Sequence, residues 1–201
     1  MKRDNYAIQV EFAKERFRSY DPDALCSKLG IHQEDGFLCV TMLNQRYRIR
    51  LADVDFSRLR GEQWVDANSF AEVLTLLDLI CDSREDRHPA HRWKNLMAFG
   101  HMFHRQLLEE RDPNADFFAA NPEGFRRACE KLGGVPFPQG DIAYRLPFFE
   151  ELPMVLQLWF GDEEFPAQLN LLLDENAGQY LRYETMHYAR GLLLKRIREE
   201  M

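Results

Sequence analysis

The sequence predicts an α+β fold with a mainly antiparallel sheet, several helices, and a C-terminal helix packed on the sheet. Two observations support this fold class, and a third shows that the chain is large enough to form a core. The expected strands occur in groups, whereas a doubly wound parallel sheet needs strands that alternate with helices. No glycine-rich phosphate loop follows an expected strand. The chain has 201 residues, 45% of them hydrophobic, which is enough for a core without disulfides.

The expected helices share apolar residues at helical spacing and ends marked by capping residues, proline or glycine. Their ranges are 5–19, 21–30, 69–82, 90–111 and 121–133, followed by a C-terminal helix that begins between Asn176 and Tyr183. The helix over 69–82 has a broad apolar face and is expected in the core. Asp112-Pro113-Asn114 is interpreted as the stop of the helix before it.

The expected strands are short apolar or alternating runs bounded by turn residues. Their ranges are 36–40, 47–51, 141–149, 153–160 and 168–173. The first two are joined by a turn at Asn44-Gln45, and the last two by an acidic turn. Glycine and proline cluster over 133–140, which we interpret as a linker. We therefore expect a single domain over 1–201, which can be subdivided into a helical part with a hairpin (1–132) and a β-rich part with a terminal helix (141–201).

The composition argues against several classes of protein. The formal net charge of −7 disfavours nucleic-acid binding, which depends on attraction to phosphates. No run of apolar residues is long enough for a membrane span, and the N-terminus does not resemble a signal peptide. The four cysteines show no CxxC spacing, which argues against a zinc ribbon, and we interpret them as small buried apolar residues. They are Cys26, Cys39, Cys81 and Cys129. We expect a cytoplasmic protein with reduced thiols.

Histidines are concentrated in one stretch of the chain. Four of the six lie within 88–104, as two HxxH pairs, and the second pair falls on an expected helix where its members share one face. Neutral imidazoles on one face can bind a transition metal, so His101 and His104 are the candidate metal ligands. The alternative is that these histidines pack in the core or cap the helix, because the spacing is not HExxH. His32 falls in a turn after Gly30, and we interpret His187, on the last helix, as a packing or hydrogen-bonding residue.

The acidic turn after residue 160 is the candidate binding site. Its proposed ligand-binding residues are Trp159, Asp162, Glu163, Glu164 and Phe165. Neighbouring carboxylates can bind a hard cation or act in acid–base chemistry. The alternative is a solvated turn in which the aspartate accepts backbone N–H groups. Asp174 is expected at the far end of the next strand, away from this cluster.

Two functions follow as hypotheses. The leading one is a non-catalytic accessory domain that binds a small ligand, a cofactor or a protein partner at the acidic turn. The alternative is a metal-dependent or acid–base hydrolytic enzyme that uses the acidic turn with nearby histidines. The sequence identifies no catalytic residue, no cofactor and no oligomeric state.

The run from Trp159 to Gln168, with Asn170 to Asp174, Ala177 and Tyr180-Leu181, resembles the C-terminal signature of domain-of-unknown-function family 3786. The resemblance covers roughly residues 140–195, and the rest of the chain matches in general layout. Members of that family occur mostly in anaerobic bacteria and archaea, and some carry an iron–sulfur segment. The resemblance therefore implies a setting in anaerobic redox or metallocofactor metabolism. This chain has no cysteine-rich cluster motif and would be the partner domain.

Overall fold

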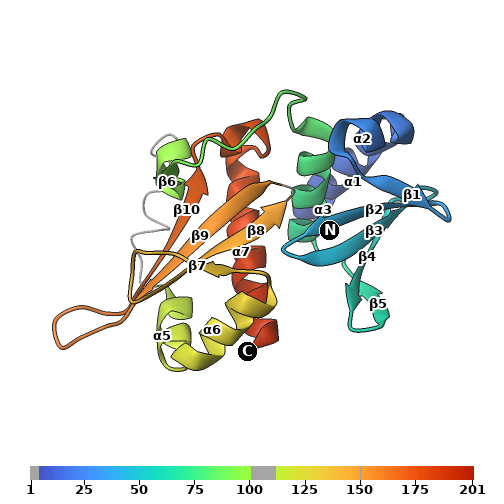
Figure 1. The fold of residues 1–201 in the computed structure, drawn as a ribbon. Coiled ribbons are helices and arrows are strands. Elements are labelled where there is room, and N and C mark those ends of the chain that lie inside the picture. The colour runs from blue at the N-terminus through green and yellow to red at the C-terminus, as the bar shows by residue number, and fades with distance from the viewer. Residues whose placement is uncertain (1–4, 101–111, 150) are drawn as a thin grey trace.

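The computed structural model describes residues 5–100, 112–149 and 151–201, and within them the predicted α+β class is confirmed (Figure 1). The helices are α1 (Asn5–Arg18), α2 (Pro22–Leu29), α3 (Phe70–Leu77), α5 (Pro113–Ala119), α6 (Pro122–Lys131) and α7 (Tyr183–Glu200). A π-helical segment, η1 (Asp78–Asp82), continues α3, and short 3₁₀ turns occur as η2 (Leu96–Phe99) and η4 (Ala177–Gln179).

The strands form one sheet in which all described neighbours run antiparallel. They are β1 (His32–Glu34), β2 (Phe37–Met42), β3 (Gln45–Arg50), β4 (Asp55–Arg60), β5 (Gln63–Asp66), β6 (Trp93–Asn95), β7 (Val135–Pro136), β8 (Ile142–Phe149), β9 (Leu152–Trp159) and β10 (Gln168–Asp174). The order is β5-β4-β3-β2-β8-β9-β10-β6, with β1 paired to β2 and β7 paired to β8. Among the described residues, one bridge, Met42 opposite Phe149, joins the N-terminal strands to the C-terminal ones.

Capping explains why several predicted helices are confirmed. Asp21 caps α2, with Pro22 in the first turn and Gly30 in the left-handed conformation at its end (φ 64°). Ser69 caps α3, where its hydroxyl accepts from the backbone N–H of Glu72. Asn121 caps α6 in the same way. The C-terminal helix begins at Tyr183, inside the expected interval.

The prediction of a helix from residue 90 is wrong for the described part. Residues 93–95 form β6, which pairs with the end of β10, and 96–99 form η2. Asp174 is fully buried and accepts backbone N–H groups from Ala90 (2.8 Å) and His91 (2.7 Å), and His91 is left-handed (φ 54°). This anchoring by a distant strand overrides the local helical pattern. Residues 101–111 lie outside the described part.

Three further expectations need correction. Asp112 is a helix start, since its carboxylate caps α5 and Pro113 occupies the first turn. The first hairpin turns at Leu43-Asn44, one residue earlier than expected, and both residues have positive φ (52° and 55°). The segment 133–140 is more than a linker, because β7 within it pairs with β8. The sequence pattern gave no prediction of β1, β4 or β5.

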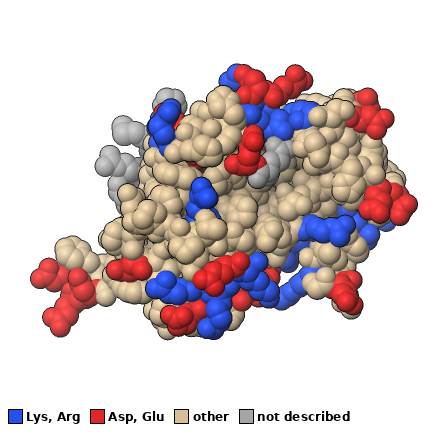
Figure 2. Space-filling model, in the orientation of Figure 1, with Lys and Arg blue, Asp and Glu red and all other residues tan. Residues whose placement is uncertain are grey.

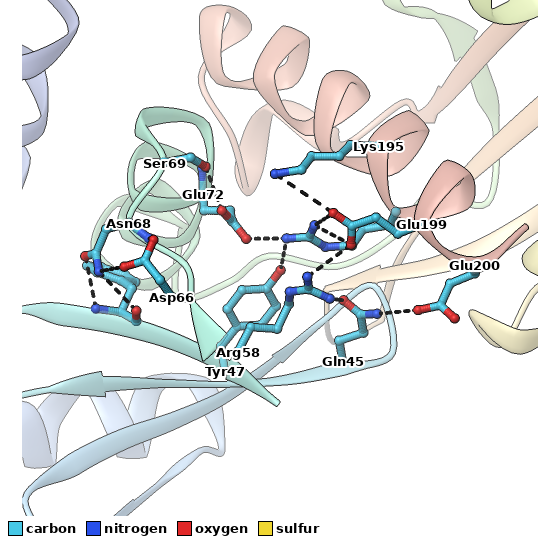
Figure 3. Close-up of polar contacts among 12 residues, drawn as sticks. Gln45, Tyr47, Arg58, Asp66, Asn68, Ser69, Glu72, Lys195, Glu199 and Glu200 are labelled. Atoms are coloured by element: carbon cyan, nitrogen blue, oxygen red, sulfur yellow. Dashed lines mark hydrogen bonds and ion pairs between the residues drawn. The ribbon is translucent and has the colours of Figure 1, made fainter. Parts of the chain in front are cut away.

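One hydrophobic cluster runs through the sheet and the helices, and α7 packs on the sheet and against α3 and α6. Inside it lies a charged network (Figure 3). Arg196 of α7 has no exposed surface; it donates to the Tyr47 hydroxyl (3.1 Å), to the Glu72 carboxylate and to Glu199 (3.0 Å). Arg58 also donates to Glu199 (3.0 Å). The network therefore joins α3 and α7 to β3 and β4.

Candidate functional site

The acidic tip, which we define as residues 160–167 between β9 and β10, is a turn organised by Asp162. The Asp162 carboxylate accepts backbone N–H groups from Glu164 (2.9 Å) and Phe165 (2.7 Å), and its own N–H donates to the Phe165 carbonyl (2.9 Å). These N–H groups, that of Phe165 first, lower the pKa of Asp162 below its ordinary value. Asp162 therefore holds the turn, as the solvated-turn interpretation expects.

The base of the acidic tip is held by two further features. The Phe160 N–H donates to the Asp141 carboxylate (2.6 Å), which ties the tip to the start of β8. A methyl group at Gly161 would lie 2.8 Å from the Ala167 nitrogen, so the backbone approaches too closely there for any other residue. The glycine and the aspartate thus give this loop a defined shape.

The acidic tip and the adjoining end of β9 carry exposed aromatic and acidic side chains together. Trp159, Phe160 and Phe165 are 41%, 43% and 61% exposed, and Glu163 and Glu164 are also exposed. The loop between β9 and β10 projects away from the rest of the molecule (Figure 1), and acidic side chains gather at that projection (Figure 2). The predicted site residues therefore do lie together, on a convex surface.

The predicted histidine site is not assembled by the described residues. His101 and His104 lie outside them. His88 lies in the connector before β6, where its Nδ1 is 2.9 Å from the Asp86 carbonyl, and His91 follows in the same connector.

Asp174 holds this connector by accepting its backbone N–H groups, and it also accepts from the Asn176 N–H (2.8 Å). It lies at the opposite end of β10 from the acidic tip, as expected.

A second group of possible metal ligands was missed by the sequence interpretation. The ligand atoms of His32, Glu34 and Cys39 lie within 4.8 Å of one another on the β1–β2 hairpin. His32 and Glu34 are exposed and Cys39 is half-buried. The sequence did contain a signal for this hairpin, because Asp-Gly is typical of two-residue hairpin turns. A turn at Asp35-Gly36 sets His32 opposite Cys39.

Comparison with protein families matches residues 21–196 to the model of a domain of unknown function (DUF3786). The chain belongs to this DUF3786 family. No curated protein and no solved structure matches it. The family match therefore agrees with the resemblance drawn from the C-terminal signature and extends it over most of the chain.

Two of the cavities of the DUF3786 domain are lined by described residues. The larger, of about 410 Å³, lies between α1, α3 and α7, and four charged groups on its wall form two pairs: Asp78 accepts from Arg182 (2.7 Å), and Asp82 accepts from Arg16. The smaller, of about 250 Å³, is lined by residues that include His32, Cys39, Arg46 and Trp64. Neither cavity includes a residue of the acidic tip.

Within the described residues, no helix is both long and apolar enough to cross a bilayer.

Proposed function

We propose that the DUF3786 domain is a non-catalytic binding module whose acidic tip docks onto a basic, partly apolar surface of a protein partner. The observation that carries this proposal is the combination of exposed Trp159, Phe160 and Phe165 with three adjacent acidic residues on one projecting turn. Aromatic side chains are enriched at the centres of protein interfaces, where they contribute much of the binding energy. Acidic residues around them favour a basic partner and speed the encounter.

The fixed shape of the turn supports binding by this loop. Asp162, Gly161 and the Asp141 contact hold the backbone before any partner arrives, so less conformational entropy is lost on binding. The convex surface suits a protein better than a small molecule, because small ligands bind in concave pockets. Neither of the two cavities lined by described residues includes Asp162 or Glu164, so neither one supports the hydrolytic alternative.

The setting of this function is part of the proposal. The resemblance in the C-terminal signature supports a partner from anaerobic redox or metallocofactor metabolism. The four cysteines are free, which supports a cytoplasmic location with reduced thiols. The net charge of −7 supports a protein partner over nucleic acid.

The test is to isolate partners with the full chain and then to measure binding of each purified partner by calorimetry. We expect Phe165→Ala, and separately Glu163→Lys with Glu164→Lys, to weaken binding by about tenfold or more, as for residues at an interface centre. The matched controls are Phe12→Ala, since Phe12 is 66% exposed elsewhere, and Glu62→Lys, which reverses an exposed charge in another turn. Equal affinity of wild type and acidic-tip variants for every partner would overturn the proposal.

A further inference from the structure

The β1–β2 hairpin brings three different metal-ligand types to one place. Asp35 and Gly36 both have positive φ (50° and 80°), so a tight two-residue turn connects the strands. The register then sets His32 directly opposite Cys39 and Glu34 opposite Phe37. Directly opposite residues project from the same face of an antiparallel pair, and residues two apart along a strand share that face. His32, Glu34 and Cys39 therefore project together.

We propose that His32, Glu34 and Cys39 bind a divalent transition metal of the zinc type, with a further coordination position open toward the neighbouring cavity. Their ligand atoms lie within 4.8 Å of one another. Tetrahedral zinc separates its ligand atoms by about 3.5 Å, given metal–ligand distances of about 2.0–2.3 Å. His32 and Glu34 are exposed, so the proposal requires only that their side chains rotate toward a shared ion while the strands stay in place.

The set of ligands selects the class of metal. A thiolate and an imidazole favour zinc and related transition metals over magnesium or calcium, which prefer oxygen ligands. Three protein ligands leave one position of a tetrahedral metal for water or a small ligand, as in zinc sites that bind substrates. The cavity of about 250 Å³ is lined by His32 and Cys39 themselves, so that position has space beside it.

Charges of both signs surround Cys39. Burial and the neighbouring Glu34 carboxylate raise the pKa of the Cys39 thiol, while Arg46 and Arg48 act in the opposite direction. A bound dication would relieve the repulsion between the Glu34 carboxylate and the Cys39 thiolate. Arg48 is fixed beside the site, because its guanidinium lies 4.3 Å from the ring centroids of both Phe37 and Trp64.

The remaining side chains of the hairpin provide a matched control. Gln33 lies between the two β1 ligands, so its side chain projects from the other face, where it donates to the Asp23 carboxylate (2.7 Å) and is hydrogen-bonded to the Cys26 thiol. Cys26 is therefore a half-buried cysteine near β1, on the side of the hairpin opposite to His32, Glu34 and Cys39. The proposal requires Cys39 and does not require Cys26.

The experiment is a titration of Co²⁺, and then Zn²⁺ in competition, into the metal-free, reduced full chain. Cobalt bound to a thiolate gives a charge-transfer absorption band, which reports the sulfur ligand directly. We expect one equivalent to bind to the wild type, and Cys39→Ser to lose the band. His32→Ala and Glu34→Ala should weaken binding more than the roughly 10–100-fold caused by losing a residue that only supports a ligand. Circular dichroism confirms that each variant is folded.

The controls separate this site from the other candidates. Cys26→Ser and the double variant His101→Ala/His104→Ala should both keep the band and the wild-type affinity. Binding should also survive Phe165→Ala, which makes the outcome independent of the proposed docking by the acidic tip. The site is ruled out if the wild type gives no thiolate band, if folded Cys39→Ser keeps it, or if Cys26→Ser or the His101/His104 variant loses it.

Discussion

Asp162 shows how a single carboxylate can serve the shape of a site rather than its chemistry. Its oxygen accepts the N–H groups of Glu164 and Phe165, and these bonds lower its pKa in the folded protein. A lowered pKa means that the charged form favours the ordered turn above the pKa of the unfolded chain, and that this preference is lost as the pH falls through the folded pKa. The acidic tip should therefore loosen in acid.

We predict that Asp162 titrates below the ordinary aspartate pKa of about 3.9, and that the Glu164 and Phe165 amide signals shift with the same midpoint. An NMR pH titration measures both. Asp162→Asn is the control, because its side-chain carbonyl still accepts an N–H but has no charge to lose near this pH. A midpoint at the ordinary value, or amide shifts that follow Glu163 instead, would contradict the role given to Asp162.

At the scale of elements, the contact between α3 and α7 depends on a buried charge. Arg196 of α7 has no exposed surface and donates to Glu72 of α3, to Glu199 and to the Tyr47 hydroxyl. Glu72 is itself 3% exposed, so removal of the guanidinium would leave an unpaired carboxylate in the core. Removing one partner of a buried ion pair destabilises a fold far more than replacing both partners by apolar residues.

We predict that Arg196→Met lowers the free energy of unfolding by about 3–5 kcal/mol, as breaking one side of a buried ion pair does. The double variant Arg196→Met/Glu72→Met should cost less than the sum of the two single changes, because neither charge is then unpaired. Chemical denaturation measures all three variants. Arg84→Met is the control, since the Arg84–Asp86 pair is exposed and its loss should change the free energy of unfolding very little. Additive effects would show that the charges do not depend on each other.

Elements with local signals could be predicted from the sequence. Caps, proline and glycine define α2, α3 and α6, and long apolar runs define β8, β9 and β10. The acidic tip was likewise predicted as a group, because its residues are adjacent in the chain. In each case the information lies within a few residues.

Elements that depend on distant partners could not be predicted in this way. The segment 90–95 has a helical pattern, yet Asp174 of β10 binds its amides and β6 pairs with that strand. The turn lies at Leu43-Asn44 rather than at the predicted Asn44-Gln45. Buried Leu43 has a positive φ, which is unfavourable for leucine, and its N–H donates to the carbonyl of distant Phe148 (2.7 Å). The group of His32, Glu34 and Cys39 required a strand pairing that the pattern left unassigned, although the Asp35-Gly36 turn was a usable signal.

At the scale of the whole molecule, the sheet has a narrow connection. In the described part of the chain, one bridge between Met42 and Phe149 joins the N-terminal strands to the C-terminal ones. The two parts are nevertheless held by one hydrophobic cluster that includes residues of both, and by the Arg196 network from α7 to β3 and β4. The packing rather than the sheet hydrogen bonds should therefore determine whether the chain unfolds as one unit.

We predict that the chain unfolds in one cooperative step, because exposing either part would open the shared cluster of the other. Two tryptophans report the two parts: Trp64 lies in β5, and Trp93 lies in β6 against Phe137. Variants that keep only one of them, Trp93→Phe/Trp159→Phe and Trp64→Phe/Trp159→Phe, should each show a fluorescence midpoint in urea that coincides with its far-ultraviolet circular dichroism. Arg196→Met should lower both midpoints together. Separate midpoints would instead support two folding units, one that contains β2–β5 and one that contains β6 and β8–β10.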